Sequence, residues 1–324
     1  MNSQRPRISI VIPTYNRREK LNRLLQSIED AQISQSYEVI VVDDSEAATS
    51  INEEIRSSLS GSLHHMKNPV RRFISSAKNI GWKNARGEYV FFIDDDNILP
   101  RGTAEALFET LEANPGMGAL MPIVYYEKKR NLVWVYAAPF AEGRWKFDLL
   151  GRNELEREKP RMRLLPTDAL PNASMVRREV LERVGGLDES LPINSSCDLC
   201  QRIKGAGYQV FALSSAEIFH DVTLPGTAGY WAEHASEDFG RRYYEVRDWF
   251  DLMSRLHRGE VLLPLKEFIR SLSFLIPVSS GILLHPTRRK QSVRRLYLSM
   301  LRGLRDGVKI SASSDAREVE VGSA

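Results

Sequence analysis

The sequence predicts a three-layer α/β protein, in which helices cover both faces of a mixed, mostly parallel sheet and a helical extension follows. Three β-branched runs carry this prediction: residues 7–12, 37–42 and 89–93. Each run ends abruptly in polar residues, as buried parallel strands do where their carboxyl ends meet at one sheet edge. With 324 residues, 27% charged and 42% hydrophobic, the chain can bury a full core.

Helices alternate with these strands. Asn16 and Glu19 have the spacing of a capping box, and four apolar residues then repeat at helical spacing: Leu21, Leu24, Leu25 and Ile28. Strand, helix and strand in this order predict a right-handed βαβ unit. Another helix begins near Pro100 and ends at Pro115. We expect further strands at 120–125, 132–136, 172–176 and 208–213, and further helices at 177–184 and 198–206.

Changes in composition divide the chain into three parts. Residues 1–235 form the main domain, and residues 236–310 form a basic helical extension. Residues 311–324 are small and polar, which predicts a disordered tail. Within the main domain, residues 141–163 are highly charged and show no period, so we expect a mobile loop there.

Charge and cysteine content narrow the functional classes. The net charge is only +3, which gives no sign of a nucleic-acid partner. Cys197 and Cys200 are the two cysteines, so the sequence has no disulfide framework and favours a reducing compartment. Their spacing fits two core residues on one helical turn better than a redox or zinc motif. No apolar signal segment precedes the first strand, so we expect a cytoplasmic protein.

One segment suggests contact with a membrane. Residues 271–284 lack charges, but they are too few to span a bilayer and include Pro277. A basic cluster follows, made of Arg288, Arg289, Lys290, Arg294 and Arg295. This pattern fits a peripheral contact of residues 261–305 with the inner face of the cell membrane. It fits equally a helix packed on the main domain with a solvated basic face.

An acidic triplet follows the third strand. Tyr89 to Ile93 is apolar and leads directly into Asp94, Asp95 and Asp96. Unpaired carboxylates are costly in a buried strand, so we expect the triplet at the strand's carboxyl end, open to solvent and to cations. Carboxylates there suit Mg²⁺ or Mn²⁺ bound together with the phosphates of a substrate. A solvated turn is the alternative, but a second strand that ends in Asp43 and Asp44 favours a binding site.

Several blocks in a fixed order then indicate a family. They are residues 11–17 (VIPTYNR), 38–45 (EVIVVDDS), 77–89 (AKNIGWKNARGEY) before the triplet, 184–189 (VGGLDE) and 198–202 (DLCQR). In this order the chain resembles the family-2 glycosyltransferases, over roughly residues 7–250. The resemblance implies a GT-A (Rossmann-like) fold and inverting, metal-dependent transfer of a sugar from a nucleoside-diphosphate sugar. The implied acceptor is a hydroxyl of a lipid-linked sugar or a polysaccharide.

The same resemblance assigns donor-binding roles by position. Pro13, Thr14 and Tyr15 would cradle the nucleotide base, and Asp44 would hydrogen-bond the base or its ribose. The diphosphate would lie along Arg71 or Lys78, with Asn79, and next to Asp94 and Asp95.

The metal, Mn²⁺ or Mg²⁺, would be held at the outer members of the triplet. Asp94 and Asp96 are these outer members, and Asp96 is the expected direct ligand. His220 stands where many family members carry a second metal ligand, although a structural role for a lone histidine is about equally favoured. An ion there would neutralise the charge of the departing diphosphate.

The sequence departs from the family at the catalytic base. The family has an acidic pair where this chain has Ser195 and Ser196, and serine is no base at neutral pH without an activator. Asp198 is the nearest candidate base, although it could instead anchor its helix, for example through Arg202. Asp188 and Glu189 are further candidates.

This departure keeps a second function open, a binding or scaffold protein that retains the donor site without catalysis. A nucleotidyltransferase is excluded, because residues 13–17 contain no glycine for a phosphate loop.

Overall fold

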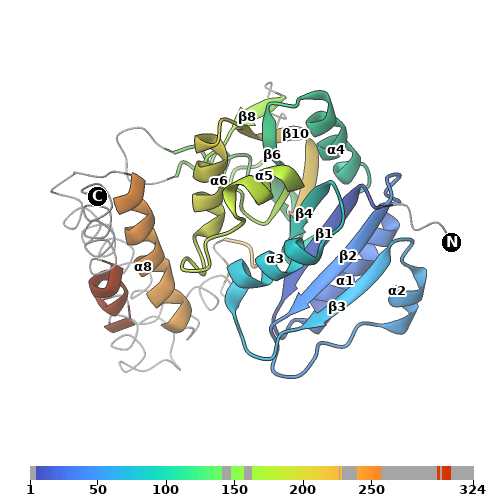
Figure 1. Ribbon diagram of the computed structural model, residues 1–324, viewed down its shortest axis with the longest axis horizontal. Helices are drawn as coiled ribbons and strands as arrows, with labels where there is room; N and C mark the ends of the chain where they lie inside the picture. The colour runs from blue at the N-terminus through green and yellow to red at the C-terminus, as the bar shows by residue number, and fades with distance from the viewer. Residues whose placement is uncertain are drawn as a thin grey trace, which may run out of the picture. The chain divides into compact units, whose positions relative to one another are not determined.

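A ten-stranded mixed sheet is the centre of the protein (Figure 1). The structure is a computed structural model that describes residues 5–140, 147–156, 163–225, 227, 239–256, 298–299 and 301–307. The chain divides into two units: Met1–Glu189 with Ser195–Val222, and Ser190–Asn194 with Thr223–Ala324. The sheet lies in the first unit, and it confirms the predicted α/β class with mostly parallel strands.

The strand order along the sheet is β3-β2-β1-β4-β9-β6-β10-β5, with β7 beside β6 and β8 beside β10. Six strands point the same way: β1 (Ile8–Thr14), β2 (Tyr37–Asp43), β3 (Ser62–Lys67), β4 (Tyr89–Ile93), β6 (Met117–Tyr126) and β10 (Gln209–His220). The others pair antiparallel: β5 (Asn97–Ile98), β7 (Lys129–Val135), β8 (Leu164–Pro166) and β9 (Ala173–Arg177). The parallel strands therefore end at one common edge.

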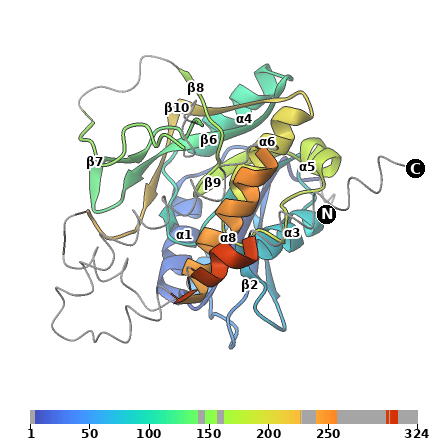
Figure 2. The ribbon, with the colours of Figure 1, turned by 90° about the vertical axis from the view of Figure 1, so that its left-hand side faces the viewer.

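Helices cover both faces of this sheet, as Figure 2 shows for α1 and α3 on opposite sides of it. The helices of the first unit are α1 (Arg18–Asp30), α2 (Glu53–Ser58), α3 (Phe73–Asn84), α4 (Thr103–Ala113), α5 (Arg178–Val184) and α6 (Ser195–Gly205). The helix α3 packs on β1 and β2, and α4 packs on β6 and β10. The predicted three layers are thus present.

The central strands are buried on both faces, which explains their unbroken apolar sequences. Every residue of β1, β2 and β4 is buried. Glu38 is a carboxylate buried within β2, away from its carboxyl end. It accepts hydrogen bonds from Ser9 (2.7 Å) and from the Arg86 guanidinium (2.9 Å). Burial alone would raise the pKa of Glu38, but these hydrogen bonds hold it below its ordinary value.

Two local predictions are wrong. Asn16 does not cap α1: the cap residue is Arg17, no side chain caps the helix, and Asn16 has a left-handed φ of 54° while its N–H donates to Ser45 Oγ. With its N–H bound to Ser45, Asn16 turns the chain instead of capping the helix. The predicted mobile loop is also wrong for residues 147–156, which hydrogen-bond to residues 131–139. Residues 141–146 and 157–162 of this segment lie outside the described ranges.

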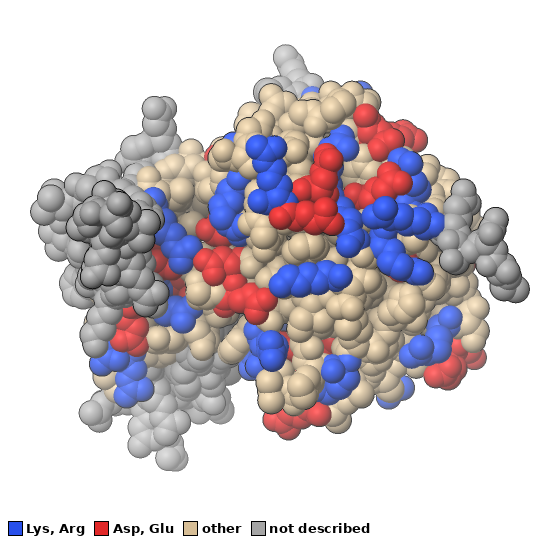
Figure 3. All heavy atoms as spheres, viewed as in Figure 1, with Lys and Arg blue, Asp and Glu red and all other residues tan. Residues whose placement is uncertain are grey.

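Five elements have no counterpart in the predictions: α2, α3 and the strands β3, β5 and β8, of which β5 and β8 are only two and three residues long. β3 alternates exposed and partly buried positions, and α3 buries polar residues such as Ser75 and Asn79, so neither shows a clear apolar period. Figure 3 shows acidic and basic side chains interspersed on the face of the first unit in view, without a surface of one sign.

The second unit contains α8 (Phe239–Leu256), which was predicted as part of a helical region. Its buried Asp248 accepts a hydrogen bond from the Ile193 N–H (2.9 Å) and pairs with Arg247 (2.6 Å). Residues 271–284 and the basic cluster after them lie outside the described ranges. In the part of the chain that the structure describes, no helix has the length and apolar character needed to cross a membrane.

Candidate functional site

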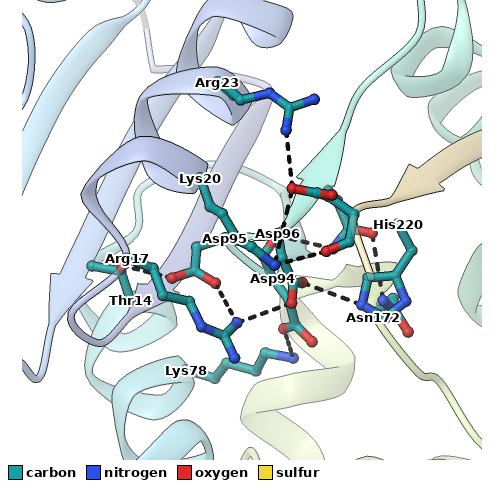
Figure 4. Close-up of polar contacts among 12 residues, drawn as sticks. Thr14, Arg17, Lys20, Arg23, Lys78, Asp94, Asp95, Asp96, Asn172 and His220 are labelled. Atoms are coloured by element: carbon teal, nitrogen blue, oxygen red, sulfur yellow. Dashed lines mark hydrogen bonds and ion pairs between the residues drawn. The ribbon is translucent and has the colours of Figure 1, made fainter. Parts of the chain in front are cut away.

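The acidic triplet lies at the carboxyl edge of the sheet, where β4 ends and β5 begins (Figure 4). β5 pairs with the end of β10, so that Asn97 lies opposite His220. The Asp221 N–H donates to the Asp96 carbonyl (2.7 Å) and closes the same junction. The register of two strands far apart in the sequence thereby brings His220 next to the triplet.

Protein cations pair with all three carboxylates of the triplet. Arg17 Nη1 lies 3.0 Å from Asp95 Oδ1 and 2.9 Å from Asp96 Oδ2, so one nitrogen bridges two acids. Lys78 Nζ lies 2.8 Å from Asp94 Oδ1, and the Thr14 hydroxyl donates to Asp95 (2.7 Å). The prediction of an acidic triplet open to solvent is therefore wrong for two members: Asp95 is 3% exposed and Asp96 is 8% exposed. Burial without a partner would be too costly, which is why Arg17 lies over them.

The two buried carboxyls titrate in opposite directions. Burial raises the pKa of Asp95 to about 6, Asp96 adds to this rise, and Arg17 and Thr14 oppose it. Burial acts on Asp96 too, but the hydrogen bond and charge of His220, together with Arg17, hold its pKa well below the usual range. The pKa of Arg17 is raised, because the neighbouring acids outweigh its burial. Asp96 therefore stays ionised and is the carboxylate best suited to face a cation.

His220 and Asp96 face each other across the site. His220 Nε2 lies 3.4 Å from Asp96 Oδ1, and an edge-on contact with Trp134 (5.1 Å between centroids) fixes the imidazole. Within the described ranges, no group of three or more His, Cys, Asp or Glu side chains is spaced to hold a metal. A carboxylate and an imidazole are nevertheless a suitable partial set for Mn²⁺ or Mg²⁺, which also takes substrate phosphates as ligands.

A second part of the site lies beyond the ends of β1 and β2. The Arg71 guanidinium stacks on the ring of Tyr15 (4.0 Å) and also lies over Phe73 (4.6 Å), whose φ is left-handed at 65°. Asp44 is buried and accepts hydrogen bonds from Asn68 Nδ2 (2.5 Å) and from the Arg72 N–H (3.0 Å). This arrangement places an aromatic ring, a cation and a carboxylate beside the triplet, on the β1–β2 side of it.

Asn79 has a structural task in this geometry. Its side-chain nitrogen donates to the Leu187 carbonyl (2.8 Å), and its oxygen accepts from the Leu187 N–H and from Trp82 Nε1, each at 2.9 Å. Gly186 lies so close that a Cβ there would meet Trp82 Nε1 at 2.5 Å, and its φ is 75°. These contacts hold α3, which carries Lys78, against the chain that follows α5.

The candidate base Asp198 is held by an ion pair. Arg202 Nε donates to Asp198 (2.8 Å), and Arg202 Nη1 donates to the Val184 carbonyl (2.6 Å), which ties α6 to the end of α5. Ser195 accepts a hydrogen bond from Ser75 (2.8 Å). Exposed Glu189 accepts from Asn79 (2.9 Å). Burial favours a higher pKa for Glu189, but hydrogen bonds and nearby cations lower it.

The two cysteines of α6 are buried and free, in agreement with the core interpretation. Burial raises the pKa of Cys197 to about 12 and also raises that of Cys200.

Several site residues were missed at the level of the sequence. Arg17 was part of the motif at residues 11–17 but was not predicted to bind anything, and no role was predicted for Lys20 or Arg23. Lys20 Nζ donates to the Asp221 carbonyl (2.7 Å), and Arg23 Nη1 pairs with the Asp221 carboxylate (2.9 Å). Their spacing of three residues, which places two cations on one face of α1, was the available signal.

Comparison with known proteins decides the family. The family model described as glycosyl transferase family 2 matches residues 9–185, which is more than half of the chain. The chain belongs to glycosyl transferase family 2. Membership carries with it the inverting mechanism and confirms the predicted enzyme class.

Relatives of known sequence are distant. An uncharacterized glycosyltransferase of Haemophilus influenzae is 25% identical over 186 residues, which is 57% of each chain. The GalNAc(5)-diNAcBac-PP-undecaprenol beta-1,3-glucosyltransferase of Campylobacter jejuni is 30% identical over 129 residues, 39% of this chain and 41% of that protein. The chain thus spans less than two thirds of the length of these curated relatives.

Solved structures agree on the fold. The mannosyltransferase PcManGT from Pyrobaculum calidifontis, in complex with GDP-Man and Mn²⁺, superposes with a TM-score of 0.51 at 18% identity over 96% of this chain and 88% of its own. S. aureus TarS gives a TM-score of 0.50 at 15% identity over 94% and 55%. At these identities the likeness shows the GT-A fold, which the sequence predicted.

Proposed function

We propose that this family-2 glycosyltransferase moves a sugar from a nucleoside-diphosphate sugar to a hydroxyl of a lipid-linked or polysaccharide acceptor, with Mn²⁺ or Mg²⁺. The observation that carries the proposal is the junction of Asp96 and His220 at the carboxyl edge of the sheet, with Arg17 and Lys78 beside it. This junction combines ligands for a cation with cations for a diphosphate. A nucleotide-sugar and Mn²⁺ in one structural neighbour, and the lipid-linked acceptor in one relative's name, support the same chemistry.

The donor's nucleotide would occupy the part of the site beyond β1 and β2. Tyr15 with its stacked Arg71 offers a flat surface for the base, together with Pro13 and Thr14 at the end of β1. Asp44 offers a carboxylate to the base or ribose. Lys78, which pairs with Asp94 here, is close enough to the triplet to turn toward a phosphate. Asn79 contributes by positioning the helix that carries Lys78, and Asp95 by holding Arg17.

The cation would be held by Asp94, Asp96 and His220. When bound, it would act as a Lewis acid that neutralises the charge of the departing diphosphate. Two neighbouring cations offset the cost of placing these carboxylates in a largely buried setting: Arg17 pairs with Asp96, and Lys78 pairs with Asp94. With donor bound, Arg17 and Lys78 could each pair either with its carboxylate or with a phosphate.

Two roles are open to Asp198. As the base it would take the proton of the acceptor hydroxyl, and as an anchor it would hold α6 through Arg202. The Arg202→Gln variant separates these roles, because it removes the ion pair and the bond to the Val184 carbonyl but keeps the Asp198 carboxylate. If Asp198 is the base, Asp198→Asn should lower kcat strongly while its melting temperature equals that of Arg202→Gln. Equal loss of activity in both variants, in step with stability, would assign Asp198 to anchoring.

We further propose that the enzyme works at the cytoplasmic face of a membrane, through residues 261–305. The sequence alone supports this placement, because most of these residues lie outside the described ranges. Co-sedimentation with vesicles of anionic phospholipid tests it, and protein that remains in the supernatant would remove the membrane from the proposal.

The test of the whole function is a transfer assay. Purified protein is mixed with a panel of nucleotide-sugars and with either polyprenyl-diphosphate-linked sugars or polysaccharides, with Mn²⁺ or with chelator. We expect one nucleotide class to be consumed, with metal and acceptor both required. Donor binding without transfer to any acceptor would instead support the catalytically impaired scaffold that Ser195 and Ser196 suggest.

A further inference from the structure

A hairpin next to His220 contains groups that the donor site leaves unused. His220 pairs in register with Tyr126 at the end of β6, and β7 returns antiparallel beside β6. Figure 2 shows β7 beside β6 and β10, away from β2. Residues 147–156 then extend this hairpin. The Val133 N–H donates to the Glu154 carbonyl, and the Val133 carbonyl accepts from the Asn153 N–H. Leu132 also forms an antiparallel bridge with Leu155.

A tryptophan and an arginine of this hairpin continue the site from His220. The ring of half-buried Trp134 contacts the His220 imidazole edge-on (5.1 Å), and the Arg152 guanidinium lies over the same ring (4.5 Å). Arg152 is held in place by a tight turn, because its N–H donates to the Leu149 carbonyl. Gly151 in that turn has a φ of 70°, and a Cβ there would meet the Tyr136 ring at 2.5 Å.

Two polar groups in this cluster have no polar partner among the described residues. His220 is only 8% exposed, yet its Nδ1 has no hydrogen-bond partner among the described residues. Buried imidazole nitrogens are normally hydrogen-bonded, so this atom indicates a missing ligand. A hydroxyl group would satisfy it in either tautomer, because a hydroxyl both donates and accepts. Arg152 likewise forms no ion pair with any residue that the structure describes, although a planar guanidinium is well suited to a phosphate.

Exposed apolar side chains lie in the same segment as Arg152. Leu149, Leu150 and Leu155 are 39%, 37% and 49% exposed, and all three lie within the segment that presents Arg152. Large apolar side chains are usually covered, so three of them in ten residues indicate a surface that meets apolar material. His220 and this segment together offer a nitrogen for a hydroxyl, a cation for a phosphate and an apolar surface.

The position of this cluster in the sheet separates it from the donor's nucleotide. Along the carboxyl edge, Asp44 follows β2, Tyr15 follows β1 and the triplet follows β4, whereas His220 is the last residue of β10, which pairs with β6. The nucleotide would lie beyond β1 and β2, on one side of β4, and the hairpin belongs to β6, on the other side of β4. An acceptor must approach the reacting sugar from the side away from the diphosphate, because the transfer is inverting.

We propose that His220 Nδ1, Trp134, Arg152 and the three leucines form the acceptor subsite, and that its ligand is a sugar joined through diphosphate to a lipid chain. In this subsite His220 hydrogen-bonds a sugar hydroxyl, Arg152 on its tryptophan support binds the diphosphate, and the leucines contact the first part of the chain. The inference rests on the proposed function, of which it chooses the lipid-linked acceptor over the polysaccharide.

The test uses farnesyl diphosphate in detergent micelles, which carries the diphosphate and the chain without a particular sugar. Its binding to the full-length protein is compared with that of farnesol and of inorganic diphosphate. We expect farnesyl diphosphate to bind more tightly than either, and Arg152→Gln to weaken it about tenfold. Trp134→Ala should have a similar effect, whereas Trp134→Phe, which keeps an aromatic support, should restore much of the affinity.

Two control variants locate the bound probe. Arg183 also lies over an aromatic ring, that of Tyr208 at 5.7 Å, so Arg183→Gln removes an equivalent contact outside the site and should leave binding unchanged. Arg17→Gln reports on the diphosphate of the donor. A loss of affinity in Arg17→Gln but not in Arg152→Gln would place the probe at the donor site and overturn the proposal.

Further arms separate the possible ligands. Binding of inorganic diphosphate as tight as that of farnesyl diphosphate would overturn the role of the leucines, and binding of vesicles of anionic phospholipid that equals it would replace the acceptor with a general membrane surface. Tight binding of soluble polysaccharide that depends on Arg152 would also overturn the lipid assignment. Donor binding, measured in parallel by calorimetry, tests the proposed function separately, because it does not require the hairpin.

Discussion

Replacing Arg17 tests how the protein stabilises its acidic triplet before any ligand arrives. Arg17→Gln removes the nitrogen that bridges Asp95 and Asp96 and leaves two neighbouring carboxylates without that cation. The guanidinium is 44% exposed, whereas the two carboxylate side chains are 5% and 10% exposed. A hydrogen bond to a charged group contributes roughly 1.5–3 kcal/mol, and solvent screening at the exposed arginine lowers the net effect. We expect a loss of about 2 kcal/mol and a melting temperature lower by roughly 4–8 °C.

The same variant should bind a metal ion more readily in the absence of donor, because the ion no longer competes with Arg17. An ion present at about ten times its dissociation constant stabilises the folded state by about 1.4 kcal/mol. Thermal unfolding is therefore followed with Mn²⁺ and with chelator, and Mn²⁺ should raise the melting temperature of Arg17→Gln more than that of the wild type.

Arg18→Gln is the matched control for this experiment. Arg18 is exposed in the first turn of α1 and forms no side-chain ion pair within the described ranges, so the control removes the same charge one residue away. It should behave like the wild type. Equal melting temperatures and equal metal shifts in wild type and Arg17→Gln would refute the reasoning that Arg17 occupies the position of a cation.

Three further predictions concern buried groups. Burial in the folded state raises the pKa of Asp95 to about 6, so ionisation of this carboxyl lowers the stability of the fold as the pH rises through that value. Asp95→Asn should therefore resist urea better than the wild type near neutral pH, and no better near about pH 4. Glu38 has a lowered pKa in the folded state, so its contribution to stability is present above its unfolded pKa and is lost as the pH falls. Glu38→Gln should lower the free energy of unfolding by about 2 kcal/mol at neutral pH and by much less in acid. For either variant, a difference from the wild type in urea stability that is the same at both pH values would contradict the prediction. Burial raises the pKa of Cys197 and Cys200, so a thiol reagent should label neither in the folded enzyme and both in denaturant; rapid labelling of the native protein would contradict their placement in the core.

The sequence was informative about the edge of the sheet, because periodicity and composition report burial along one strand. Runs such as Val39 to Val42 have no polar interruption, so their ends, and the acids that follow, could be placed before the structure was known. Order along the chain was also sufficient to recognise the family. One strand that could not be predicted, β3, alternates between exposed and partly buried positions at the margin of the sheet.

Long-range pairing could not be predicted in the same way. Arg17 lies 78 residues before Asp95, and nothing in either local pattern indicates that one nitrogen would bridge two acids. The expected helix cap at Asn16 failed for the same reason, because tertiary contacts of the triplet and of Ser45 determine the backbone there. The stacking of Arg152 on Trp134 depends on the pairing of residues 147–156 with β7, which a charged segment without a period does not reveal.

The most direct test of the account is calorimetric titration of the purified enzyme with nucleoside diphosphates and nucleotide-sugars, in Mn²⁺ and in chelator. We infer that the triplet and His220 form a metal-dependent donor site. One nucleotide class should therefore bind, chelator should remove this binding, and Asp96→Asn, which keeps the size of the side chain, should abolish it. Binding that is equally tight in chelator, or unchanged in Asp96→Asn, would contradict the claim.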